Sequence, residues 1–251
     1  MKPLLIQTVT VLVFAAVWET VAESGLLFAG ILPGIGEILR AAWVLASSGA
    51  IFPHLLVTVH EASVGFVFAA LFGIALGVLL GTQPFLRRVF EPPLLYFAAT
   101  PKIILYPIFL MLLGAKLESK MAMAAVSGFF PIVVNTTIAS AGVNRVFLKV
   151  ARSVGASRLQ IFTRVYFPSM LLPVAGGARL GIGVSLVAAI LGELKVSNAG
   201  LGFIIMQSFN HFRIPEMYAG ILLTFLFAAA VNVAMTLLLM RCRSFAHESA
   251  R

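Results

Sequence analysis

Charge is scarce in this chain, and aspartate is missing altogether. Of the 251 residues only 11% are charged, with 18 Lys and Arg against 9 acidic residues, and every acidic residue is Glu. A soluble domain of this length has about a quarter of its residues charged. Cys242 is the single cysteine, so neither an internal disulfide nor a cysteine-based metal cluster can form. These absences exclude a soluble globular enzyme, a disordered chain and a disulfide-built secreted module.

Apolar sequence, in contrast, is abundant. Hydrophobic residues make up 61% of the chain, and the mean hydropathy is +1.05. A helix needs about 20 mainly apolar residues to cross a hydrocarbon core about 30 Å thick. The chain is therefore predicted to be an all-α integral membrane protein with about six transmembrane helices, the first of them retained rather than cleaved as a signal peptide. The predicted spans are residues 4–22, 55–80, 94–114, 121–141, 170–192 and 217–240.

The basic residues between these spans predict the orientation. If the N-terminus is inside, eleven Lys and Arg residues fall in inner segments and five in outer ones. An excess of Lys and Arg marks the cytoplasmic side, so both termini are predicted to be cytoplasmic. The long outer connection, residues 23–54, contains a predicted amphipathic helix at 37–46 that would lie along the outer surface. The outer basic residues are Arg40, Lys116, Lys120, Lys195 and Arg213.

Residues 144–168 form the one sizeable inner loop. Apolar residues recur there at helical spacing, first before Gly155 and then after it. Gly155 can adopt the left-handed conformation of a turn. Ser157 followed by Gln160 is a capping-box pattern that starts a second helix, which Pro168 is expected to end. Both apolar faces are too short to be stable alone in water. The hairpin is therefore expected either to lie on lipid headgroups or to dock against a cytoplasmic partner.

This loop resembles the EAA loop of binding-protein-dependent ABC transporter permeases. Residues 150–157 read Val-Ala-Arg-Ser-Val-Gly-Ala-Ser, Phe167-Pro168 follows, and the family's initial Glu-Ala-Ala is replaced by Val150-Ala151-Arg152. In that family the loop inserts into a groove of the ATP-binding subunit and couples nucleotide-driven closure to helix movement. The residues to which the resemblance assigns this coupling role are Val150, Ala151, Arg152, Ser153, Gly155, Ala156, Ser157, Arg158 and Pro168.

Further segments are similar to the nitrate/sulfonate/taurine branch of that family, in the family's order along the chain. They lie at residues 54–58, 65–66, 73–81, 101–107, 128–136 and 200–205. The resemblance implies an ABC importer type I permease fold. It also implies three parts: a first transmembrane helix with an outer amphipathic segment at 1–53, the permease domain at 54–240, and a cytoplasmic tail at 241–251.

The same resemblance implies the partners. Two copies, as a homodimer in the lipid of a bacterial inner membrane, would form the pathway for a small solute such as nitrate, a sulfonate or taurine. A substrate-binding protein would dock outside, near the second outer loop at 195–216, and an ATP-binding subunit inside. ATP and Mg²⁺ would bind only that subunit, so no cofactor, metal or nucleic acid is expected on this chain. Transport would proceed by alternating access.

Small residues recur every four positions along the second and fifth spans. Such spacing lets helix backbones approach closely in lipid, where no hydrophobic force joins helices. The pattern fits static packing and a sliding interface equally well. The glycines concerned are Gly65, Gly73, Gly77, Gly81, Gly177 and Gly181.

Two charged residues in the fifth span are candidates for a polar pathway. Arg179 lies deep in the span and Glu193 fourteen residues later, about 21 Å along the axis on a similar face. A charge at such depth should face protein or water rather than lipid. The alternative is that Arg179 pairs structurally with Glu19, with Glu61 or with backbone carbonyls. Lys102, near the inner end of the third span, is expected to extend toward the membrane surface.

Enzyme chemistry finds little support in the sequence. There is no Gly-x-x-x-x-Gly-Lys-[Ser/Thr] phosphate loop, no His-Glu-x-x-His and no nucleophile elbow. The chain is therefore expected to be a transport subunit, with ATP hydrolysis in a separate partner. The alternatives are a secondary transporter, which would carry an inverted repeat that we do not find in the sequence, and an intramembrane hydrolase or transferase.

Overall fold

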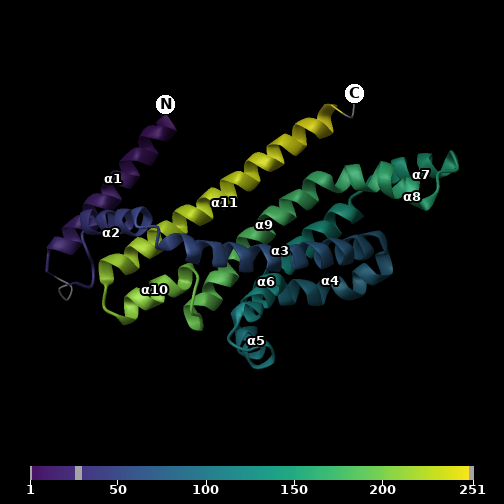
Figure 1. Cartoon of the computed structure of the whole chain (residues 1–251). Helices are drawn as coiled ribbons and strands as arrows, with labels where there is room; N and C mark the ends of the chain where they lie inside the picture. The colour runs from purple at the N-terminus through teal and green to yellow at the C-terminus, as the bar shows by residue number, and fades with distance from the viewer. Residues whose placement is uncertain (1, 26–29, 249–251) are drawn as a thin grey trace. The chain divides into compact units, whose positions relative to one another are not determined.

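The computed structural model describes residues 2–25 and 30–248, and within these ranges the secondary structure is helical (Figure 1). The chain divides into two compact units, Met1–Val57 with Asn198–Phe227 and Thr58–Ser197 with Ala228–Arg251. Five of the described helices are long and apolar enough to cross a membrane, or six if one bent pair counts as a span. The predicted all-α membrane fold with about six spans is confirmed.

The first unit contains α1 (Lys2–Glu23), α2 (Ile35–Ser47) and α10 (Leu201–Asn210), together with the start of α3 (Ile51–Thr82) and of α11 (Ile214–Glu248). The predicted amphipathic helix at 37–46 is confirmed as α2. Two side chains of α1 hold the start of α2: Trp18 Nε1 donates to the Pro33 carbonyl at 3.1 Å, and Glu19 Oε2 accepts from the Ile35 amide at 2.9 Å.

Three buried residues, Ile51, Leu201 and Ile204, form the apolar core of this unit. Beside them, His54 Nδ1 accepts a hydrogen bond from the Gly200 amide at 3.1 Å. The His54 ring also stacks on the Phe203 ring, with 5.6 Å between the ring centroids. These contacts join α10 to the first turns of α3. The loop before α10 is therefore held in place by side-chain contacts.

The second unit is organised around α6 (Leu117–Ala141). Gly128 of α6 approaches both neighbours, because a Cβ built on it would lie 2.1 Å from Ser185 Oγ of α9 (Phe167–Lys195) and 3.3 Å from Ala69 Cβ of α3. The Ser185 hydroxyl also donates to the Ala124 carbonyl of α6 at 3.0 Å. Helix α6 thus lies in direct contact with α3 and α9.

The third predicted span, residues 94–114, is not one straight helix. It is formed by α4 (Pro84–Ala99), the 3₁₀ turn η1 (Lys102–Leu105) and α5 (Tyr106–Leu113), with a bend of 89° at the break. Pro101 explains the break, because the residue before a proline is driven out of the helical region, and Thr100 is extended with ψ 139°. The carbonyls at the end of α4 are satisfied locally: Thr100 Oγ1 donates to Tyr96 O at 3.0 Å and Lys102 Nζ donates to Ala98 O.

The expectation that Pro168 ends the second loop helix is wrong. Helix α8 (Arg158–Ile161) continues through the π turn η2 (Phe162–Tyr166) into α9, and Pro168 stands in the first turn of α9. A proline is tolerated in a first turn, and the wider π turn shifts the hydrogen-bond register immediately before it. The fifth span is therefore the end of a longer helical segment, Arg158–Lys195.

Candidate functional site

The inner loop folds as two short helices joined by a glycine turn, as its sequence predicts. Helix α7 (Arg145–Ser153) is closed at its C-terminus by two backbone hydrogen bonds. The Gly155 amide donates to the Arg152 carbonyl and the Ala156 amide to the Ala151 carbonyl, both at 3.0 Å. This is a Schellman ending, which requires a left-handed residue, and Gly155 supplies it with φ +71°. Helices α7 and α8 pack against each other at the end of α9 farther from Lys195 (Figure 1).

A reciprocal cap starts α8. The Gln160 amide donates to Ser157 Oγ at 3.3 Å, and the Ser157 amide donates to Gln160 Oε1 at 2.8 Å. This confirms the predicted capping box and fixes the angle at which the chain leaves the turn.

The apolar side chains of this hairpin are not covered within the chain. Val150 is 56% exposed, Val154 76% and Leu159 71%. Of the nine residues assigned to coupling, Ala151 and Ala156 are half-buried and the other seven are exposed. The hairpin therefore presents an apolar surface flanked by exposed basic side chains, a composition that fits both a docking element and a hairpin on lipid headgroups.

All six glycines singled out in the sequence stand where another helix approaches closely. A Cβ on Gly77 would lie 2.5 Å from Thr136 Cβ, and one on Gly81 would lie 2.3 Å from Ser140 Cβ. Gly65 and Gly73 likewise face α6 from α3, and Gly177 and Gly181 face α6 from α9. The glycines thus permit backbone contacts on both sides of α6 that a side chain would prevent.

Arg179 lies near the middle of α9, about 18 Å from the first residue of that helix. Its guanidinium donates twice to one amide oxygen of α11, from Nε to Asn232 Oδ1 at 3.1 Å and from Nη2 at 2.7 Å. The alternatives proposed from sequence, Glu19 and Glu61, have other partners: the Ile35 amide and Lys120. The sequence did not predict Asn232 as the partner of Arg179. The available signal was that Asn232 is the one side-chain amide in the apolar run 217–240.

A hollow of about 410 Å³ adjoins Arg179, lined also by Leu172, Thr236, Leu239 and Met240. Arg179 as a whole residue is half-buried, whereas the hydrogen bonds of its guanidinium to Asn232 are exposed. An arginine has five N–H donors, and the Asn232 oxygen accepts from two of its nitrogens. The remaining donors can therefore bind water or an anion in the hollow.

Glu193, the second pathway candidate, is placed differently. It is 1% exposed, and its Oε1 accepts a hydrogen bond from Thr58 Oγ1 at 2.6 Å. The structure does not bring Glu193 and Arg179 together, in agreement with their fourteen-residue spacing along one helix. In this conformation the Glu193 carboxyl faces protein rather than a hollow.

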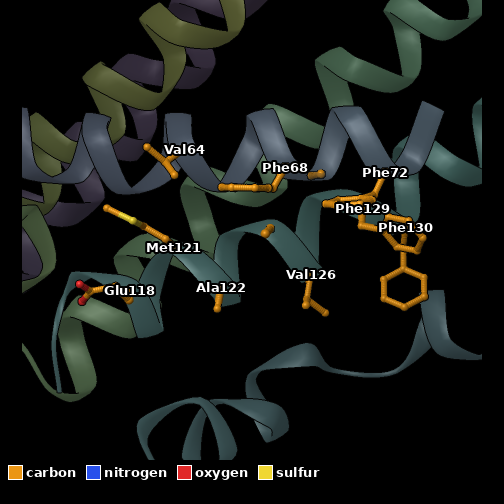
Figure 2. A pocket seen from close by; sticks show the side chains of 11 residues that line it. Val64, Phe68, Phe72, Glu118, Met121, Ala122, Val126, Phe129 and Phe130 are labelled. Atoms are coloured by element: carbon orange, nitrogen blue, oxygen red, sulfur yellow. The ribbon is translucent and has the colours of Figure 1, made fainter. Parts of the chain in front are cut away.

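A larger groove of about 660 Å³ lies between α3 and α6, and Figure 2 shows its lining. Side chains such as Phe68, Phe72, Met121 and Phe129 make it apolar, and Glu118 is the only charged residue in its lining. Such a surface suits a lipid tail or an apolar helix face. It offers no group that would bind a small anion.

Comparison with known proteins decides the family. A profile described as "binding-protein-dependent transport system inner membrane component" matches residues 69–243. The chain belongs to this family. As a permease of a binding-protein-dependent system, it works with an ABC ATP-binding subunit and a substrate-binding protein and is a multi-pass inner-membrane protein. It is a transport subunit and not an enzyme, so the two alternatives, secondary transporter and intramembrane enzyme, are set aside.

Curated relatives agree with the branch suggested by the sequence. The permease is 28% identical to the putative aliphatic sulfonates transport permease SsuC of Bacillus subtilis, over 89% of this chain and 79% of SsuC. It is 26% identical to the taurine transport system permease TauC of Escherichia coli, over 84% of this chain and 79% of TauC. It is 31% identical to the formylaminopyrimidine permease ThiX of Halalkalibacterium halodurans, over 70% of each chain.

The fold of the permease is also found in a solved structure. An inward-facing form of the MetNI methionine ABC transporter superposes with a TM-score of 0.65, covering 82% of this chain and 96% of that one at 19% identity. This likeness shows a type I ABC importer fold.

Proposed function

We propose that two copies of this permease form a pathway for a small anion across a bacterial inner membrane, and that Arg179 binds the anion on its way. ATP and Mg²⁺ would act only on the partner ATP-binding subunits, whose closure switches the two copies between inward-open and outward-open states. The solute would be a sulfonate, nitrate, taurine or a similar anion.

The position of Arg179 carries this proposal. It is a half-buried arginine near the middle of an apolar helix, with its guanidinium beside a hollow and bound to a neutral amide. A charge at this depth of a membrane-spanning helix is costly without a carboxylate partner unless water or a ligand reaches it. A guanidinium also matches the geometry of sulfonate and nitrate oxygens, as it does that of carboxylates and phosphates. Because Glu193 is enclosed by protein, the proposal rests on Arg179 alone.

Uptake of nitrate, taurine and an alkanesulfonate into vesicles that hold the complete transporter tests this assignment. If Arg179 attracts the anion by its charge, Arg179→Lys keeps much of the uptake and Arg179→Gln loses most of it. Arg88→Gln, an exposed arginine of α4, is the control and should transport normally. Equal uptake of these anions by wild type and Arg179→Gln would overturn the proposal.

Asn232→Ala separates this role from a purely structural one. It removes a hydrogen bond to a charged group, worth about 1.5–3 kcal/mol, but leaves the Arg179 charge in place. If Arg179 is structural, Asn232→Ala and Arg179→Gln should lower the melting temperature and the uptake together. If Arg179 binds solute, Asn232→Ala should keep clearly more uptake than Arg179→Gln at equal stability.

The α7–α8 hairpin would dock in the ATP-binding subunit. Its exposed apolar residues would be buried by a partner surface. Gly155 lies at the tip of the hairpin, and a Cβ built on it would meet no atom within 4 Å. Gly155→Asp puts a carboxylate into that contact, at a left-handed position that aspartate and asparagine both tolerate better than other side chains. Gly155→Asn is the matched control, because asparagine tolerates the left-handed conformation and adds no charge.

We expect Gly155→Asp to insert at normal levels, to co-purify poorly with the ATP-binding subunit and to transport slowly. Gly155→Asn should retain more of both activities. Full co-purification of Gly155→Asp would rule out docking through this turn.

A further inference from the structure

A buried polar cluster lies between α3, α5, α6 and α9 in the second unit, and the proposed transport function makes no use of it. Three of its members are ionisable and almost completely enclosed: Glu61 is 0% exposed, Glu193 1% and Lys120 3%. Lys120, which the sequence predicts to lie in an outer segment, has its side chain enclosed near the start of α6.

The contacts within the cluster are specific. Lys120 Nζ lies 3.4 Å from Glu61 Oε1. Glu193 Oε1 accepts from the Thr58 hydroxyl at 2.6 Å. Thr58 stands three residues before Glu61 on α3, so the Glu193 carboxyl meets the face of α3 that also bears Glu61. Next to Glu193 in α9, the Gly192 carbonyl accepts from the Tyr106 hydroxyl at 3.0 Å. Every helix that borders the cluster thus contributes at least one polar group.

Glu61 stands out because its carboxyl is incompletely satisfied. Neither of its oxygens meets a hydrogen-bond partner among the described residues, although Lys120 is near. A buried carboxylate in this state is costly, because it has lost its water without gaining donors. Protonation of the carboxyl would reduce this cost, because a neutral acid is less costly to bury than a carboxylate.

The net charge of the cluster also indicates a bound proton. Two carboxylates and one ammonium carry a net charge of −1 when all are ionised. The other charged or titratable groups nearby do not correct this, since His60 and Lys195 are exposed and Tyr106 is occupied by its bond to Gly192. Charge inside a membrane protein is tolerated when it is balanced, and the cluster is short of one positive charge.

We propose that this cluster is a proton-binding site, in which the Glu61–Glu193 carboxyl pair holds one proton beside the Lys120 ammonium. One carboxyl oxygen carries the proton as an O–H, and the other carboxyl remains a carboxylate that balances Lys120. The cluster is then neutral, and it can join α3, α6 and α9 without a stranded charge.

Infrared spectroscopy of the purified full-length permease in D₂O tests this directly, because a protonated carboxyl gives a C=O stretch separate from the carboxylate bands. The chain favours the measurement, since it has nine acidic residues and no Asp. At neutral pH the wild type should show the band of one protonated carboxyl. Absence of that band in folded wild type overturns the proposal.

Charge-changing variants give a quantitative pattern. Glu61→Gln and Glu193→Gln should each lose the band, because the remaining carboxylate alone balances Lys120. Lys120→Met should roughly double the band, because both carboxyls must then be protonated. Glu118→Gln, an exposed residue of the same helix turn as Lys120, is the control and should leave the band unchanged.

Stability provides a second readout if one variant folds poorly. Gln is close in shape to a protonated Glu, so at least one of the two Glu→Gln variants should melt near the wild type. Persistence of the full band in both Glu→Gln variants would place the proton elsewhere and reject the site.

Discussion

Replacing Gly81 by alanine tests how closely α3 and α6 approach. A Cβ at Gly81 would lie 2.3 Å from Ser140 Cβ and 2.6 Å from the Thr137 carbonyl oxygen. The carbonyl is backbone and cannot rotate away, so the two helices must separate. Overpacking of this kind costs about 1–3 kcal/mol, and with a backbone atom in the way we expect a loss of about 3 kcal/mol.

Two further glycines of α9 provide graded controls. At Gly181 the nearest atoms are the side-chain atoms Ile132 Cδ1 and Cγ1, both at 2.6 Å, and the nearest backbone atom, Gly128 O, lies at 3.2 Å, farther than Thr137 O from Gly81. Gly181→Ala should therefore cost only about 1 kcal/mol. At Gly183 nothing lies within 4 Å. Since alanine is favoured over glycine in helices by about 1 kcal/mol, Gly183→Ala should be neutral or stabilising.

Melting of the purified permease in detergent measures this order. For a chain of this length 1 kcal/mol corresponds to about 2–4 °C in Tm, so Gly81→Ala should melt several degrees below wild type. If Gly183→Ala lowers Tm as much as Gly81→Ala, the reasoning from close contacts is refuted.

The same variants address whether these glycines pack statically or slide. With static packing, Gly81→Ala should transport normally at temperatures well below its Tm. With a sliding interface, uptake should fall even where the protein is fully folded.

Two other substitutions have defined outcomes. Phe212 has φ 54° and its side chain is 85% exposed, so Phe212→Gly removes left-handed strain of about 1 kcal/mol and should raise Tm; a lower Tm would show that the ring has a packing role. Ser157→Ala removes one half of the capping box, a loss of about 1 kcal/mol. Hydrogen exchange should accelerate for the amides of α8, because the exposed hairpin then opens locally more often, and unaltered exchange would contradict the cap.

Several features could be read from the sequence because they depend on local interactions. Hydropathy runs predict spans, since crossing a membrane requires only length and apolarity. The turn at Gly155 and the cap at Ser157 follow from hydrogen bonds within a few residues. Even the break in the third span has a local cause, because Pro101 forces Thr100 out of the helical conformation.

The partners of the charged side chains could not be predicted from the sequence by itself. It established that Arg179 and Glu193 lie deep in one helix, but not that Arg179 meets Asn232, 53 residues away, or that Glu193 meets Thr58, 135 residues away. Helix periodicity gives the direction of a side chain relative to its own axis, whereas its partners depend on which helix packs against that face. Only the tertiary structure, by packing α3 and α9 against α6, decided that Glu61, Lys120 and Glu193 share one enclosed site.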